Sequence, residues 1–139
     1  MSELIAQPDV DDVMVTFFNT QLPVQTGFAG VPTQTGIPNP RPSRHVRTFV
    51  TGGGEINLVT EEALVTVESF GETEAEAAAL ARMNDALLKR AGRAGWLGST
   101  ACKSVRTVSR PQNLPDPLYS GIRYTALYAI RFGGAVITD

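Results

Sequence analysis

The sequence ALVTVESFGETEAEAAALARMNDALLKRAG (residues 63–92) joins a strand pattern directly to a helix pattern, and it decides the fold. Residues 63–70 form a short run rich in β-branched side chains, which is typical of a central strand. Thr73 and Glu76 have the spacing of a capping box, and Gly92 closely follows two basic residues at the other end. We therefore expect a strand over 63–70 and a helix from Thr73 to Ala91.

The segment before this stretch contains a second helix pattern and a proline-rich region. Apolar residues at helical spacing predict an amphipathic helix over 9–22, and Pro23 ends it because the residue before a proline resists helical geometry. Residues 24–34 are expected to form one irregular strand. Residues 37–42 carry proline at every second position, which predicts a stiff and extended loop.

Three further strand patterns complete the chain. Alternating side chains predict a strand over 44–51, and Gly52-Gly53-Gly54 predicts a tight reversal after it. Another strand is expected over 101–109. The longest, over 122–132, alternates strictly, so one of its faces is expected to be buried. Between these two strands, residues 110–121 hold three prolines and are expected to form a protruding loop that cannot pair as sheet.

The order of these elements is helix, strands, helix, strands. Two helices on one face of a mostly antiparallel sheet bury the apolar stripes of both layers in the simplest way. The sequence therefore predicts an α+β fold of two layers, with the whole chain (residues 1–139) as a single domain.

The composition limits the classes of function. The chain has 12 basic and 14 acidic residues, and this net charge of −2 disfavours a protein that coats nucleic acid. One cysteine, Cys102, allows no intrachain disulfide, so assembly in the cytoplasm and a buried thiol are expected. The first nine residues lack the pattern of a secretion signal, and no run approaches the roughly 18 apolar residues of a membrane span.

The sequence offers little for catalysis. Glu61 and Glu62 are adjacent, so on a strand they would point to opposite faces, and a solvated turn is the simpler expectation. The glycines at 52–54 lack the spacing and the following helix of a phosphate-binding loop. His45 has no carboxylate nearby in the sequence, and we expect it at the surface. We predict no catalytic residue, no metal site and no cofactor.

Trp96 has two possible roles. It lies between glycines in a joint that follows the second helix. Its large apolar side chain could fold back onto the core, or it could be an anchor at a protein–protein interface. The sequence leaves both roles open.

The chain resembles the tail terminator family of long-tailed bacteriophages that infect actinobacteria. The features that carry the resemblance extend over most of the sequence in a characteristic order, and they are VTFFNTQL (15–22), IPNPRPSR (37–44), TGGG (51–54), ALVTVESFG (63–71) and ETEAEA (72–77). The segment NPRP (39–42) is the most specific of them. The strand and helix segments alone would fit many small α+β proteins.

The resemblance implies a structural subunit of the virion neck. Such a subunit forms a ring, expected to be a hexamer, that caps the tail tube, stops its growth and meets a head-completion or stopper protein. Genomic DNA would only pass through its lumen, and no membrane is involved. The expected contact residues lie mainly in the two proline-rich loops, and they are Pro38, Asn39, Pro40, Arg41, Pro42, Arg44, Trp96, Pro115, Asp116 and Pro117. The alternatives are another neck component, or a small hydrolase or ligand-binding domain that uses the groove between helix and sheet.

Overall fold

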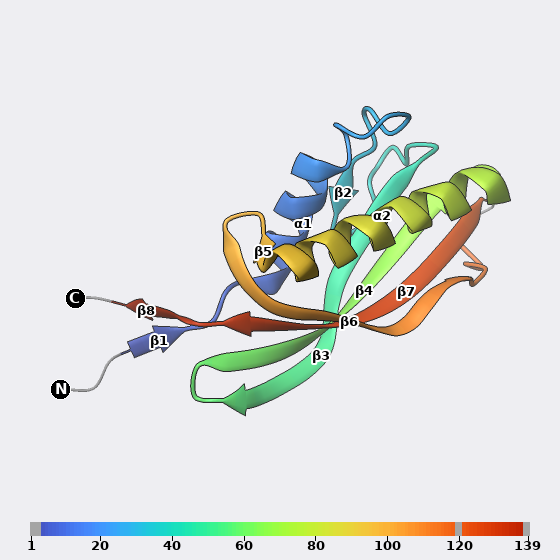
Figure 1. The fold of residues 1–139 in the computed structure, drawn as a ribbon. Helices are drawn as coiled ribbons and strands as arrows, with labels where there is room; N and C mark the ends of the chain where they lie inside the picture. The colour runs from blue at the N-terminus through green and yellow to red at the C-terminus, as the bar shows by residue number, and fades with distance from the viewer. Residues whose placement is uncertain (1–3, 119–120, 138–139) are drawn as a thin grey trace.

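The computed structural model describes residues 4–118 and 121–137. They form an α+β fold, as the sequence predicts, in which both helices cover one face of a curled and mostly antiparallel sheet (Figure 1). The elements in chain order are β1 (Leu4–Ala6), α1 (Val10–Gln21), β2 (Thr33–Gln34), β3 (His45–Asn57), β4 (Thr60–Gly71), α2 (Glu74–Ala94), β5 (Trp96–Leu97), β6 (Thr100–Asn113), β7 (Ile122–Gly133) and β8 (Ala135–Ile137).

The larger sheet has the order β2-β3-β4-β7-β6-β5, so the predicted central strand lies between β3 and β7. Residues 63, 65, 67 and 69 of β4 point toward the helices. Within the core, the Asn84 side-chain amide of α2 donates a hydrogen bond of 2.9 Å to the Ser69 hydroxyl of β4. The apolar side chains of both helices and of this sheet face pack as one cluster, which includes Phe18, Val65 and Leu88. A second sheet of two strands, β1 and β8, projects beside the β3–β4 hairpin (Figure 1).

Both predicted helices are present, with small differences at their ends. The Asp9 carboxylate caps α1 by accepting a hydrogen bond from the Asp12 amide. The second helix continues past Gly92 to Ala94 and ends at Gly95, which has the left-handed φ of 86° that favours glycine. Gly92 instead lies inside the helix, where a Cβ atom would come within 3.0 Å of the Val105 side chain, so its role is close packing on β6.

The predicted reversal at Gly52-Gly53-Gly54 is wrong. These glycines lie inside β3, where the register with β4 shifts between Val50 and Gly52, and the turn is made by Leu58 and Val59. Gly53 has a φ of 130°, and a Cβ atom there would overlap the carbonyl oxygen of Glu62. Glycine is therefore needed at position 53 for its positive φ and for the close approach of the two strands. Consequently Glu61 and Glu62 belong to β4 and not to a turn.

Two other boundaries differ from the prediction. Of residues 24–34, only Thr33 and Gln34 form a strand, which pairs parallel to β3. Strand β6 continues to Asn113, so residues 110–113 do pair as sheet. The register is irregular between Ser109 and Gln112, and this irregularity accommodates Pro111, which has no amide to donate. The predicted loop therefore begins at Leu114, and Tyr119 and Ser120 within it lie outside the described residues.

The close approach of Gly53 to β4 predicts a specific sensitivity. Gly53→Val should destabilise the protein by about 2 kcal/mol, because the new side chain must displace the β4 backbone at a strained φ. Gly54→Ala is the matched control, since a Cβ atom there meets nothing within 4 Å. Urea unfolding followed by circular dichroism measures both. Equal midpoints for the two variants would contradict this role of Gly53.

Candidate functional site

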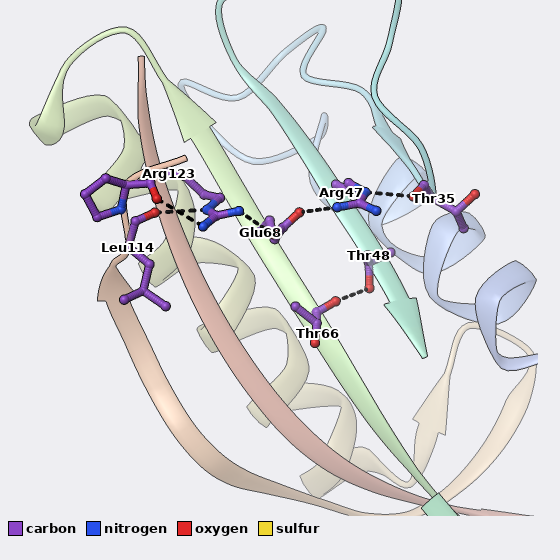
Figure 2. Close-up of polar contacts among 8 residues, drawn as sticks. Thr35, Arg47, Thr48, Thr66, Glu68, Leu114 and Arg123 are labelled. Atoms are coloured by element: carbon purple, nitrogen blue, oxygen red, sulfur yellow. Dashed lines mark hydrogen bonds and ion pairs between the residues drawn. The ribbon is translucent and has the colours of Figure 1, made fainter. Parts of the chain in front are cut away.

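A buried carboxylate lies on the sheet face that points away from the helices. Glu68 of β4 follows Val67, whose side chain enters the core, so its own side chain takes the opposite face. It is 6% exposed and accepts bonds from Arg47 of β3 at 3.0 Å and from Arg123 of β7 at 3.1 Å (Figure 2). We call these three residues the Glu68 bridge, and it joins three neighbouring strands.

Each arginine of the Glu68 bridge also holds a loop. The Arg47 side chain donates to the carbonyl oxygen of Thr35 at 3.0 Å, in the segment that leads into the first proline-rich loop. The Arg123 side chain donates to the carbonyl oxygens of Leu114 at 2.9 Å and of Pro115 at 3.3 Å, at the start of the second loop (Figure 2). One carboxylate therefore anchors both proline-rich loops at the same end of the sheet.

The charges explain why the three side chains stay together. A carboxylate taken out of water loses hydration that only close cations and hydrogen bonds can replace. Both oxygens of Glu68 are engaged by guanidinium groups, which favour such charge-assisted bonds. The arginines keep 33% and 21% of their side-chain surface exposed, so their own loss of hydration is smaller. The Glu68 bridge is thus a stable, partly buried network.

The predicted surface position of His45 is wrong. His45 is fully buried and stacks on Phe70, with ring centroids 4.3 Å apart and an interplanar angle of 6°. The two residues are register partners on β3 and β4, and the Arg41 guanidinium lies 5.5 Å from the Phe70 ring. Burial lowers the pKa of His45 to about 4; a backbone hydrogen bond at Pro42 opposes this effect and the Arg41 charge adds to it. The sequence did not indicate that the loop before β3 folds over this ring.

The structure separates the predicted contact residues into exposed and anchoring groups. In the first loop Asn39 and Pro40 are exposed, while Pro38, Arg41, Pro42 and Arg44 are half-buried. The Arg44 side chain donates to the carbonyl oxygen of Gly27 at 2.9 Å, so both loop arginines contact their own chain. In the second loop Pro115 and Pro117 are exposed and Asp116 is half-buried, accepting a bond from the Leu118 amide.

Trp96 is not part of the same surface. It lies in β5, which pairs with the start of β6, whereas the proline-rich loops lie at the other end of the sheet. Its side chain is 55% exposed, so the expectation that it folds back onto the core is wrong. Its role as an interface anchor stays a prediction.

A cleft between α2 and the β6 edge of the sheet has a volume of about 590 Å³. We call it the α2–β6 cleft, and its lining residues are Ala78, Arg82, Asp85, Lys89, Thr107, Arg110, Pro111 and Tyr124. The carboxylate of Asp85 in this cleft already has two partners within the chain. It accepts a hydrogen bond of 2.7 Å from the Tyr128 hydroxyl and forms an ion pair with Lys89 at 2.8 Å. Burial and this bond raise the pKa of Tyr128, which keeps the hydroxyl protonated as a donor.

The sequence predicted a groove between helix and sheet only as the site of an alternative function, and it did not identify the residues that line the α2–β6 cleft, although a signal for them existed. Arg82, Asp85 and Lys89 are three and four residues apart, a spacing that places them on one face of a helix. Moreover, seven of the 12 basic residues lie between Arg82 and Arg110, a segment in which Asp85 is the single acidic residue. The net charge of −2 by itself does not show this local excess.

The described residues offer no metal site and no membrane-spanning helix. Within residues 4–118 and 121–137, no three His, Cys, Asp or Glu side chains come close enough together to hold a metal ion. Cys102 is buried, as expected, and burial raises the pKa of its thiol. Neither helix of the described chain has the length and apolar character needed to cross a bilayer. The sequence matches no protein-family model and no curated protein.

The Glu68 bridge predicts that one substitution loosens both loops. Glu68→Gln should lower the free energy of unfolding by about 2–3 kcal/mol, because two partly buried arginines lose their shared carboxylate. Glu62→Gln removes a more exposed pair with Arg131 and should cost under about 1 kcal/mol.

Hydrogen exchange of the folded variants provides the second measurement. Faster exchange in both residues 35–44 and 114–118 is expected for Glu68→Gln and in neither segment for Glu62→Gln. Unchanged exchange in either loop of Glu68→Gln would contradict the role of the bridge.

His45 predicts a pH dependence of stability. Its pKa is lower in the folded than in the unfolded chain, so the unfolded state binds more protons between about pH 6.5 and 4. The protein should therefore lose on the order of 3 kcal/mol as the pH falls through this window. His45→Gln, which cannot titrate, should show a flatter profile in urea unfolding from pH 7.5 to 4. Parallel profiles for the two proteins would exclude His45 as the cause.

Proposed function

We propose that the chain is a tail terminator of a long-tailed bacteriophage, a structural subunit of the virion neck that acts through its surfaces. The observation that carries the proposal is the Glu68 bridge, which fixes both proline-rich loops at one end of the molecule. The order of sequence features that resembles the terminator family is the second support. The expected ring, its neighbours and its place in the virion all belong to this proposal.

Preformed loops suit a protein whose task is to dock. A loop that is already fixed loses less conformational freedom on binding, so more of its contact energy appears as affinity. The exposed residues Asn39, Pro40, Pro115 and Pro117 are held on such loops. They would form one contact surface of the terminator, toward the tail tube or the head side.

The opposite end of the molecule carries a second surface. The β3–β4 hairpin ends there in apolar residues, with Ile56 43%, Leu58 85% and Val59 41% exposed (Figure 1). Clustered exposed apolar side chains are typical of contact sites. A subunit with different surfaces at its two ends is suited to join two different neighbours, the tail tube and a head-completion or stopper protein.

Two alternatives have observations in their favour. Another neck component, such as a stopper, would use the same kind of preformed loops. A ligand-binding domain or small hydrolase would use the α2–β6 cleft, which is the groove between helix and sheet that such a domain requires. Saturable binding of a small molecule, measured by calorimetry and abolished by Arg82→Ala, would favour this second alternative.

The proposal is tested by disabling the gene in its phage and imaging the lysate by negative stain. A terminator predicts overlong tails without heads, because tube growth no longer stops. Tails of normal length that fail to join heads would favour a stopper instead. Expression of the intact gene from a plasmid should restore tail length, and normal particles in its absence would rule out both neck functions.

A further inference from the structure

The β3–β4 hairpin and the α2–β6 cleft have complementary chemistry. We infer that the α2–β6 cleft of one copy binds the tip of the β3–β4 hairpin of a second copy. This inference rests on the proposed ring and adds to it the surfaces that would meet between neighbouring subunits.

The α2–β6 cleft is suited to carboxylates. It presents Arg82, Lys89 and Arg110, while the carboxylate of Asp85 is already bonded to Tyr128 and Lys89. The cleft therefore keeps an excess of positive charge. Ala78 and Pro111 add apolar wall to the same opening. An acidic segment with apolar side chains would satisfy both kinds of surface.

The β3–β4 hairpin has the acidic and apolar composition that such a cleft requires. Glu55 and Glu61 are direct register partners on the two strands, so their side chains share one face of the hairpin. Like charges in this position repel each other. No ion pair to either carboxylate is found within residues 4–118 and 121–137. Cations from a second copy would relieve this repulsion.

The tip of the hairpin supplies the apolar part. Leu58 is 85% exposed, and Ile56 and Val59 flank it with 43% and 41% exposed. These side chains lie next to the Glu55–Glu61 pair, just as Ala78 and Pro111 lie next to the cations in the cleft. The hairpin tip thus offers both chemistries in one short segment.

The positions of the two surfaces fit repeated association. The hairpin belongs to the β3 side of the sheet, and the cleft lies along β6 on the opposite side. A contact between two different surfaces of the same chain is head-to-tail, so a bound pair leaves the hairpin of one copy and the cleft of the other free. Such a contact repeats until its rotation closes a ring.

Cross-linking between copies tests the contact directly. In Leu58→Cys/Ala78→Cys, a short bismaleimide should link hairpin to cleft and give a ladder of multimers on a denaturing gel, both in concentrated solution and in purified phage particles. Leu58→Cys/Val24→Cys is the control, since Val24 is 73% exposed and lies outside the cleft. Buried Cys102 is common to both variants. Absence of the ladder from both solution and particles, or equal ladders in both variants, would overturn the inference.

Charge reversal tests the electrostatic part. Glu55→Lys/Glu61→Lys and Arg82→Glu/Arg110→Glu should each weaken self-association about tenfold in sedimentation equilibrium, and the quadruple variant should recover it. Glu72→Lys, exposed at the start of α2, should have no effect. Failure of the quadruple variant to recover, or loss of binding to a DNA oligonucleotide in Arg82→Glu/Arg110→Glu with unchanged self-association, would overturn the inference and identify nucleic acid as the occupant.

The two levels of the proposal can fail separately. Rings seen on tail ends without hairpin-to-cleft cross-links would refute this contact and leave the terminator function in place. Cross-linked ladders from a protein that is absent from virions would support the contact and refute the terminator function.

Discussion

The structure depends on the pairing of one buried carboxylate with two guanidinium groups. Glu68 lies on the central strand, and its two partners extend from the strands on either side. Because a carboxylate without partners is costly away from water, the position of Glu68 constrains both arginines, and their remaining donors constrain the backbone of two loops. Sheet, loops and outer surface are therefore connected through a single side chain.

Much of the fold could be predicted because its signals are local. The capping residues and the apolar stripe define α2, and strict alternation defines β7. The errors arise where distant segments decide the outcome. Three consecutive glycines are typical of a turn, but Gly53 allows a close approach of strands that is visible only beside Glu62 of the neighbouring strand. His45 has polar neighbours in sequence, but Phe70 and the preceding loop enclose it.

The candidate site was predicted only in part. Proline content indicated both loops, since proline restricts the backbone wherever it occurs, but the second loop begins at Leu114 and not at Arg110. The Glu68 bridge could not be predicted, because Arg47, Glu68 and Arg123 are far apart in sequence and are brought together by strand register alone. Arg41 and Arg44 lie over the chain's own aromatic rings, and their contact with a partner stays a prediction. The local excess of basic residues is visible in the sequence, but only the fold brings those of α2 and β6 together at one cleft.

The hydrogen bond between Asn84 and Ser69 has a consequence for the whole cationic surface. Apolar contacts between a helix and a sheet are not directional, so they define the alignment of the two less strictly than a hydrogen bond does. An amide that must meet one hydroxyl in the core permits a single alignment. This hydrogen bond fixes the position of α2 along the sheet. The spacing between the cations of α2 and those of β6 is therefore set within the monomer, without any contribution from a bound neighbour.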